Sequence, residues 1–140
     1  MRGGVARASR FVLDTSAILA LRGSERGADR VESLLRAAGA GRFQVMLSFM
    51  TRMEVLCRVA SDEGAEEAAS AIRLLDAMDV TWVSCEDAIL TEAARIKAGG
   101  GLSVADAWIA ATAVQRQAVL VHKDPEFDRL DHVEQERLPS

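Results

Sequence analysis

Four carboxylates near the ends of predicted strands and helices are the residues of this sequence best suited to chemistry. Asp14 follows a short apolar run, and a lone buried carboxylate is costly unless it is paired, hydrogen-bonded or bound to a cation. Glu54 and Asp106 fall near the starts of two predicted helices, and Asp124 follows another apolar run. Carboxylates that converge without Lys or Arg beside them repel one another, and divalent cations are the usual remedy. Two Mg²⁺ ions about 4 Å apart could then clamp the oxygens of a phosphodiester displacement.

Helix capping is the structural alternative for two of these acids. Glu54 follows Thr51 by three residues and Asp106 follows Ser103 by three, which is the spacing of a capping box. Taken singly, each acid fits a cap better than a metal ligand. Small and apolar residues nevertheless cover almost every side of the predicted helix over 104–116, which is typical of a buried helix. We therefore expect Asp106 to face the interior or a cleft rather than bulk water.

The elements that must position these acids alternate between strands and helices. Short β-branched and apolar runs predict strands over 10–14, 43–48, 80–84 and 118–122. Apolar residues at helical spacing predict helices over 15–23, 31–38, 51–60, 65–75, 86–97 and 104–116, and a short helix over 124–130. This alternation predicts an α/β fold around a mostly parallel sheet, in which ligands lie at the carboxyl ends of strands. Asp14 and Asp124 could thus be close in space.

The two cysteines, and the helix that carries one of them, are predicted to contribute to the core. Met53, Leu56, Cys57 and Ala60 repeat at helical spacing, which predicts that they form the buried face of their helix. Cys57 and Cys85 match no metal or redox spacing. Their apolar-patterned surroundings indicate reduced core thiols of a cytosolic protein rather than a disulfide.

Length and composition predict one globular domain. A chain of 140 residues fits a single domain. Its 21 Asp and Glu against 17 Lys and Arg do not indicate nucleic-acid binding by bulk charge, although cations bound to the carboxylates would change that balance. The arginines before the first apolar run are reminiscent of a signal peptide, but Asp14 interrupts that run, and no stretch approaches the roughly 20 apolar residues of a membrane span. We therefore expect a flexible leader over 1–10, a cytoplasmic location and no membrane contact.

Four segments, taken in order, carry a resemblance to a known family. VLDTSAIL, TRME, LSVADAWIAATA and LVHKDPEFDRL resemble the motifs of PIN-domain proteins, and most of all those of the VapC-type toxin ribonucleases of toxin–antitoxin pairs. The resemblance extends from Phe11 to about Leu138. It implies a single PIN-like nuclease domain over 11–138, folded as a three-layer α/β/α sandwich, and a Mg²⁺- or Mn²⁺-dependent endoribonuclease that hydrolyses RNA. It also implies a homodimer and a cognate antitoxin protein that covers the site.

The resemblance also assigns site residues. The resemblance implies four catalytic and metal-binding acids: Asp14, Glu54, Asp106 and Asp124. The supporting hydroxyl after the first acid is Thr15 or Ser16, and we favour Ser16 as the side chain that faces the site. His122 stands where the family often has Thr; it could hydrogen-bond a site water, bind metal or be a structural residue. Asp128, one helical turn beyond Asp124, is either an alternative ligand or a solvated acid.

Other side chains have both a structural and a functional interpretation. Trp82 and Trp108 are most simply core or interface anchors, and stacking on an RNA base is the alternative. The arginines that could meet phosphates, or stay solvated, are Arg52, Arg58 and Arg129. The methionines that could fill the core, or form a groove for a partner helix, are Met46, Met50 and Met53.

Two other classes of function stay open. The chain could be a non-catalytic PIN-like module that binds RNA or a protein partner, with the acids retained for folding. It could also be a receiver-like phosphoacceptor domain, because Asp14 ends a strand of an α/β fold and Lys123 lies in a late loop. A receiver also needs an acid pair before the phosphorylated Asp, however, and the order of the acids does not fit that demand.

Overall fold

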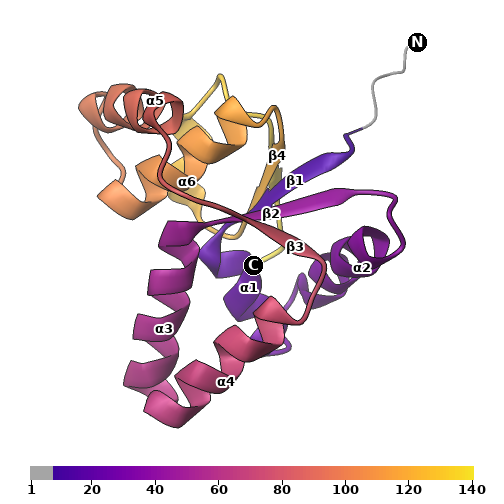
Figure 1. Cartoon of the computed structure of the whole chain (residues 1–140). Coiled ribbons are helices and arrows are strands. Elements are labelled where there is room, and N and C mark those ends of the chain that lie inside the picture. The colour runs from indigo at the N-terminus through magenta and orange to yellow at the C-terminus, as the bar shows by residue number, and fades with distance from the viewer. Residues whose placement is uncertain (1–7) are drawn as a thin grey trace.

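Five short runs of the chain pair into one parallel sheet within residues 8–140, the part that the computed structural model describes (Figure 1). The strands are β1 (Arg10–Leu13), β2 (Gln44–Ser48), β3 (Val80–Val83), β4 (Val119–His122) and β5 (Gln135–Arg137). Their order is β3-β2-β1-β4-β5, and each neighbouring pair is parallel. Because β2 and β3 lie on one side of β1 while β4 and β5 lie on the other, the strand order reverses between β1 and β4. In open α/β sheets, ligands bind at such a switch point.

Helices make the crossovers between the main strands, as parallel pairing requires. They are α1 (Thr15–Arg22), α2 (Ala28–Gly39), α3 (Phe49–Glu63), α4 (Ala65–Asp76), α5 (Asp87–Ala98) and α6 (Val104–Gln115), followed by the 3₁₀ helix η1 (Pro125–Arg129). Figure 1 shows α1 to α4 on one side of the sheet and α5 and α6 on the other. The predicted α/β/α sandwich around a parallel sheet is confirmed.

The central strands β1 and β2 are apolar on both faces because each face is covered by helices. In β1, Phe11 and Leu13 belong to the core under α1 to α4, whereas Val12 belongs to the core under α5 and α6. The same alternation places Val45 and Leu47 of β2 on the first face and the residue between them on the second. This two-sided burial explains why the strands read as continuous apolar runs.

Helix α3 begins two residues earlier than predicted and buries a different face. Ser48 caps it by accepting the N–H of Met50 at 3.1 Å. Its buried residues are Thr51, Val55 and Val59. The predicted buried face is wrong, because the structure exposes Met53, Leu56, Cys57 and Ala60. This helix has apolar residues on two faces, and packing against the sheet and α4 decides which face is buried.

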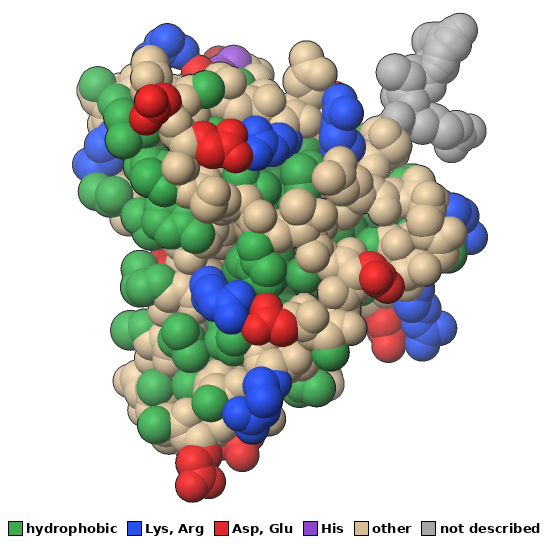
Figure 2. All heavy atoms as spheres, viewed as in Figure 1, with side chains coloured by type: hydrophobic (Ala, Val, Ile, Leu, Met, Phe, Trp, Pro, Cys, Tyr) green, Lys and Arg blue, Asp and Glu red, His purple; other side chains and the backbone are tan. Residues whose placement is uncertain are grey.

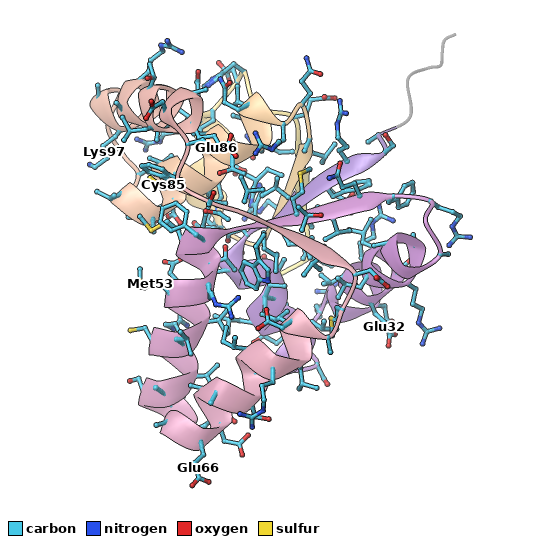
Figure 3. All side chains as sticks on the ribbon, in the orientation of Figure 1. Glu32, Met53, Glu66, Cys85, Glu86 and Lys97 are labelled. Atoms are coloured by element: carbon cyan, nitrogen blue, oxygen red, sulfur yellow. The ribbon has the colours of Figure 1, made fainter. Side chains whose placement is uncertain are left out.

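The prediction that both cysteines lie in the core is wrong as well, because Cys57 and Cys85 are both exposed. Both are free thiols in the structure, as predicted. Cys57 lies on the outer face of α3, and Cys85, which is labelled in Figure 3, lies in the loop between β3 and α5. Within residues 8–140, the helices are too short or too polar to cross a bilayer.

The last strand, β5, has no counterpart among the predicted elements. It has three polar residues that are partly or fully exposed at the sheet edge, so no apolar alternation marks it. At the other end of the chain, the Ser9 carbonyl accepts the N–H of Gln44 at 2.8 Å, and β1 begins at the next residue. Residues 1–7 of the predicted leader lie outside the described residues.

The loop between α1 and α2 packs against the C-terminal segment beside β4. Gly27 in this loop has a φ of +95°, a conformation that favours glycine. A Cβ atom at this position would lie 3.0 Å from the Cβ of Leu138. Leu138 is itself buried and donates its N–H to the His122 carbonyl at 2.7 Å. Leu138 therefore joins this loop to the end of β4.

We expect Gly27→Ala to lower the free energy of unfolding by about 2 kcal/mol. It adds a tight contact with Leu138 to the cost of a left-handed residue, which is roughly 1–2 kcal/mol. Gly41→Ala is the matched control, because Gly41 has a φ of +76° but a Cβ atom there would meet no other atom within 4 Å. Its expected loss is about 1 kcal/mol. Urea unfolding measures both, and equal losses would contradict the role given to Leu138.

Candidate active site

A cleft of about 470 Å³ lies at the carboxyl ends of β1 and β4, at the switch point of the sheet. The four acids singled out from the sequence all line it: Asp14, Glu54, Asp106 and Asp124. The other lining residues are Thr15, Ser16, Leu19, Glu25, Arg58 and Lys123. The acids come from the ends of two strands and from helices α3 and α6, so the tertiary fold brings together residues that are far apart in the chain.

Asp14 ends β1 and caps α1 with one of its two carboxylate oxygens. Oδ2 accepts the N–H of Ser16 at 3.0 Å and its hydroxyl at 2.5 Å. The N–H of Asp14 donates to the Val121 carbonyl of β4 at 2.9 Å. Oδ1 is buried and has no hydrogen-bond partner among residues 8–140. Burial raises the pKa of Asp14; the hydrogen bonds from Ser16 oppose this shift, and the charge of Glu54 adds to it.

The two carboxylate oxygens of Asp14 differ: Oδ2 makes the helix cap, and Oδ1 is left for a ligand. Asp14 is 3% exposed and its Oδ1 is buried, so bulk water does not satisfy Oδ1. A buried carboxylate oxygen without a partner is costly, and a bound cation is one of the few arrangements that removes this cost. Asp14 therefore caps a helix with Oδ2 and is able to hold a cation with Oδ1.

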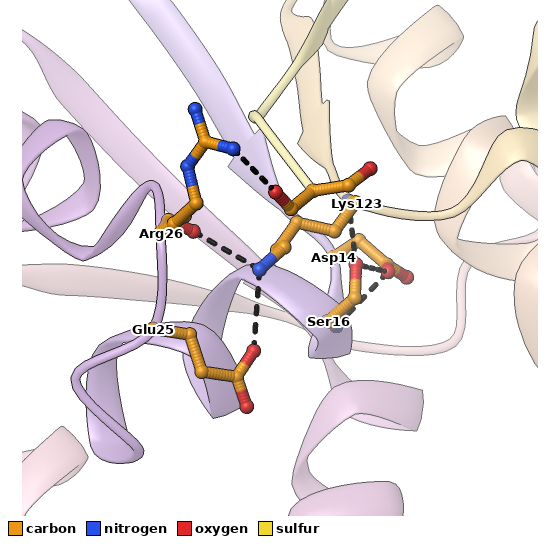
Figure 4. A network of polar contacts seen from close by, with 6 residues as sticks. Asp14, Ser16, Glu25, Arg26 and Lys123 are labelled. Carbon is orange, nitrogen blue, oxygen red and sulfur yellow. Dashed lines mark hydrogen bonds and ion pairs between the residues drawn. The ribbon is translucent and has the colours of Figure 1, made fainter.

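Ser16 joins the ends of β1 and β4 beside the cleft (Figure 4). Its hydroxyl accepts the N–H of Lys123 at 2.9 Å and donates to Asp14. The Lys123 ammonium donates to Glu25 Oε1 at 3.2 Å and to the Arg26 carbonyl at 3.0 Å. Lys123 thus fastens the loop between α1 and α2 to the rim of the cleft, and its charge is paired with Glu25.

Glu54 lies in the second turn of α3 and is held by Thr15. The Thr15 hydroxyl donates to Glu54 Oε1 at 2.6 Å and lies 3.4 Å from the Thr51 hydroxyl. Because Ser48 caps α3, Thr51 lies inside the helix, and the capping-box interpretation of Glu54 is wrong. Both hydroxyls that follow the first acid therefore orient an acid of the cleft.

Asp106 lies in the first turn of α6, which Ser103 caps. The Ser103 hydroxyl accepts the Asp106 N–H at 3.1 Å, so the cap predicted from the spacing is present while the Asp106 carboxylate lines the cleft. Burial raises the pKa of Asp106 to about 7, and the charges of Asp14, Glu54 and Asp124 contribute. Within residues 8–140, none of these four acids forms an ion pair. Their negative charge is therefore left for a ligand to compensate.

Asp124 caps η1 and lies beside an acid that the sequence patterns did not single out. Its Oδ1 accepts the N–H of Glu126 at 2.9 Å. One carboxylate oxygen from each of Asp106, Asp124 and Glu126 lies within 4.8 Å of the other two, which is close enough to share one cation. The available sequence signal was Pro125: a proline directly after a capping acid indicates a helix start and places the next residue in the first turn.

His122 is fully buried beneath the loop that carries Asp124. The N–H of Asp124 donates to His122 Nδ1 at 3.1 Å, so Nε2 carries the ring proton and donates to Gln135 Oε1 at 2.8 Å. The Gln135 amide donates in turn to the carbonyls of Phe127 and Leu130, at 2.9 and 3.0 Å. Since the protein engages both ring nitrogens, this geometry favours a positioning role for His122 over metal binding.

Arg58 lines the cleft, whereas Arg52 and Asp128 form ion pairs elsewhere. Arg52 pairs with Asp76 at 2.8 Å. Asp128, considered above as an alternative ligand, is exposed and pairs with Arg137 at 2.8 Å. These pairs lie near the surface and contribute little to stability. Neither Arg52 nor Arg129 lines the cleft, so the geometry favours Arg58 as the arginine that could contact a ligand there.

Comparisons with known proteins agree with this geometry. Residues 11–133 match the family model described as PIN domain. A comparison with curated proteins gives no match.

Several solved structures share the fold over nearly the whole chain. A chain of VapBC2 from Rickettsia felis, bound to a DNA fragment from their promoter, is 15% identical with a TM-score of 0.74, and the match covers 93% of this chain and 99% of that one. VapBC-1 from nontypeable Haemophilus influenzae is 25% identical with a TM-score of 0.71, over 91% and 97% of the two chains. VapC20 from Mycobacterium tuberculosis, a Sarcin-Ricin loop cleaving toxin, is 19% identical with a TM-score of 0.67, over 92% and 99%.

We expect Asp106→Asn to stabilise the metal-free protein at neutral and alkaline pH. The pKa of Asp106 is raised from 3.8 to about 7 in the folded state, so the folded protein keeps a proton that the unfolded chain releases. This group therefore lowers the free energy of unfolding as the pH rises from about 4 to about 7. Asn does not ionise, so the variant should match the wild type below pH 4 and exceed it by about 1–2 kcal/mol at pH 8, after discounting for solvent screening of this half-buried group.

Urea unfolding in EDTA across this pH range measures the difference. Asp128→Asn is the control, because it removes a carboxylate that lies outside the cleft and pairs with Arg137. If Asp106→Asn gave no more stability than this control at pH 8, the crowding of charge around Asp106 would be refuted.

Two variants of His122 separate the two hydrogen bonds of its ring. His122→Asn keeps an acceptor near the position of Nδ1, whereas His122→Gln keeps a donor near the position of Nε2. We expect the Asp124 amide to exchange with solvent roughly fivefold to tenfold faster in the Gln variant than in the Asn variant, because only the former loses the bond to Nδ1. Amide exchange followed by NMR tests this, with global stability measured alongside. Equal rates in the two variants would count against a positioning role.

Proposed function

The chain belongs to the PIN domain family, and on that basis we propose that it is a metal-dependent endoribonuclease, the toxin of a type II toxin–antitoxin pair. The observation that carries this proposal is Asp14 Oδ1, a buried carboxylate oxygen with no hydrogen-bond partner in the described chain, in a cleft that holds Glu54, Asp106 and Asp124 as further acids without an ion pair among residues 8–140. One protein of the same fold, VapC20, is a toxin that cleaves the Sarcin-Ricin loop, which supports nuclease chemistry for this cleft.

The residues of the cleft fit a divalent cation such as Mg²⁺ or Mn²⁺. Hard cations of this type take carboxylate oxygens and water as ligands. Asp14 uses Oδ2 for its helix cap and keeps Oδ1 for an ion, and Asp124 uses Oδ1 for its cap and keeps Oδ2. Together with Asp106 and Glu54, they supply the carboxylates that would hold one or two ions.

The side chains around the acids set the conditions for hydrolysis. When bound, the cation would lower the pKa of a water and stabilise charge that develops on the phosphate. Glu54 accepts the hydrogen bond of the Thr15 hydroxyl on Oε1, which leaves Oε2 either to hold the ion or to accept the proton of the attacking water. Ser16 maintains the distance between the acids of β1 and β4. Arg58 is placed to contact a phosphate of the RNA from the cleft wall.

Two apolar surfaces support the proposed protein partners. Figure 2 shows hydrophobic side chains gathered along the side of the molecule formed by α3, α5 and α6. Met53, which points away from the core in Figure 3, is 50% exposed there, and Val104 is 59% exposed. We assign this surface to the homodimer. A separate apolar groove of about 240 Å³ between α1, α3 and α4 suits an amphipathic helix, and we assign it to the antitoxin.

A cytoplasmic location belongs to the same proposal. Cys57 and Cys85 are free thiols, which fits a reducing compartment. Access to cellular RNA and to an antitoxin would require that compartment as well.

An RNA-cleavage time course tests the function. We expect the wild type to cleave RNA in the presence of Mg²⁺ or Mn²⁺, EDTA to abolish the cleavage, and Asp106→Asn to slow it by roughly a hundredfold or more, because a ligand of the cation is lost. Asp128→Asn serves as a control that removes a carboxylate outside the cleft and should cleave at the wild-type rate.

The outcomes separate the nuclease from a non-catalytic module. Equal cleavage by the wild type and by Asp106→Asn would place the activity elsewhere or in a contaminant. RNA binding without cleavage in any arm, with a metal present, would favour the alternative in which the fold binds RNA and the acids serve only folding.

A further inference from the structure

Lys123 brings a positive charge to the cleft without neutralising any of its four acids. It directly precedes Asp124 in the chain, and its backbone N–H donates to the Ser16 hydroxyl, which in turn donates to Asp14. Lys123 lines the same cleft as the acids. Within residues 8–140, however, no ion pair joins it to any of them. The ammonium group is therefore directed elsewhere, although its backbone is joined to two of the acids.

The ammonium is held by two acceptors on the loop between α1 and α2. It donates to Glu25 Oε1 at 3.2 Å and to the Arg26 carbonyl at 3.0 Å. Figure 4 shows it on the side of these two residues, with Ser16 between it and the Asp14 carboxylate. Because only 15% of the Lys123 side chain is exposed, the side chain is packed in this position rather than free in solvent.

Glu25 offers its carboxylate from a fixed backbone. Its N–H donates to the Ala20 carbonyl at 2.9 Å, and its own carbonyl accepts the N–H of Ala28 at 3.0 Å. The next residue, Arg26, donates from Nη1 to a backbone oxygen of Ser140 at 3.0 Å. The acceptor for Lys123 is therefore positioned by α1, by α2 and by the C-terminal segment together.

An ammonium released from this loop would compete with a metal ion for the acids. Lysine carries its charge on a flexible stem of four carbons, and carboxylates that repel one another are stabilised by a nearby positive charge. Asp14 Oδ1, which is buried without a partner among residues 8–140, is an acceptor for either cation. Glu25 is the one acid in that range that pairs with Lys123, and its side chain is 55% exposed. Since an ion pair with such an acid is weak, the position of the ammonium depends on a single carboxylate.

We propose that Glu25 is a positioning residue of the cleft: it holds the Lys123 ammonium on the loop between α1 and α2 and so keeps the four acids open to a divalent cation. The inference rests on the proposed function, because the cation is the one proposed to serve hydrolysis. It gives this loop a part in metal binding through a residue that is not itself a ligand.

A double-mutant cycle tests the inference, with Mn²⁺ binding to the metal-free, full-length protein measured by calorimetry and by the loss of the free-ion EPR signal. We expect Glu25→Ala to weaken binding about tenfold, which corresponds to an ammonium that occupies the acids in about nine of ten metal-free molecules. Lys123→Met removes the competitor and should bind Mn²⁺ at least as tightly as the wild type. The combined variant should bind within about twofold of Lys123→Met, because the effect of Glu25 acts through Lys123.

Asp128→Ala is the matched control for the loss of one acid. It removes the acid of another surface ion pair, outside the cleft, and should bind Mn²⁺ within about twofold of the wild type. Thermal unfolding of each variant in EDTA shows whether a loss of binding is a loss of fold.

The outcomes separate this inference from the nuclease proposal. If Glu25→Ala weakens Mn²⁺ binding equally with and without Lys123, Glu25 acts as a ligand or through its charge alone, and the inference is wrong. If Lys123→Met weakens binding as much as Glu25→Ala does, the pair only anchors the loop. A Glu25→Ala variant that binds like the wild type overturns the inference as well. In these three cases the metal site itself stands, whereas a wild type that binds no Mn²⁺ overturns both the inference and the metal dependence of the proposed function.

Discussion

The burial of Asp14 with one satisfied and one unsatisfied oxygen is the constraint on which the cleft depends. Oδ2 caps α1, so the carboxylate cannot turn toward solvent without breaking the helix cap, and the backbone N–H of the same residue bonds to β4 and holds the main chain of Asp14 in place. Ser16 depends on the same position, because its hydroxyl reaches both Asp14 and Lys123. The site is thus built into the central strand pair rather than attached to its surface, which keeps the first ligand rigid.

Helix N-termini position three of the four acids. Asp14 begins α1, Asp106 lies in the first turn of α6, and Asp124 begins η1. The positive end of a helix dipole stabilises a nearby carboxylate, which lowers the cost of gathering these charges. The dipoles do not compensate the charges fully, since the pKa of Asp106 still rises to about 7. Capping therefore fixes where the acids stand, and the remaining repulsion leaves a need for a cation.

Helix α3 contributes one face to the cleft and the core and exposes another face at the surface. Its inner face buries Val55 and Val59 and presents Glu54 to the cleft, where Thr15 holds it. Its outer face leaves Met53 and Leu56 exposed, next to the exposed apolar residues of α5 and α6. A partner bound to that outer face would rest on the same rigid helix that carries an acid of the cleft, because side chains on opposite faces of one helix share its backbone.

The sequence by itself determined the α/β class, the order of the main strands and helices, and the four acids of the cleft, because apolar periodicity and helix-start signals are local properties of the chain. The family resemblance added their grouping into one site. Only the tertiary structure decided that α3 buries Val55 rather than Met53, that both nitrogens of His122 are engaged by the protein, and that Glu126 stands beside Asp106. Each of these depends on contacts between segments far apart in the sequence: which helical face meets the sheet, and which loop lies over which strand end. Local spacing carries no information about such contacts, so packing alone settles them.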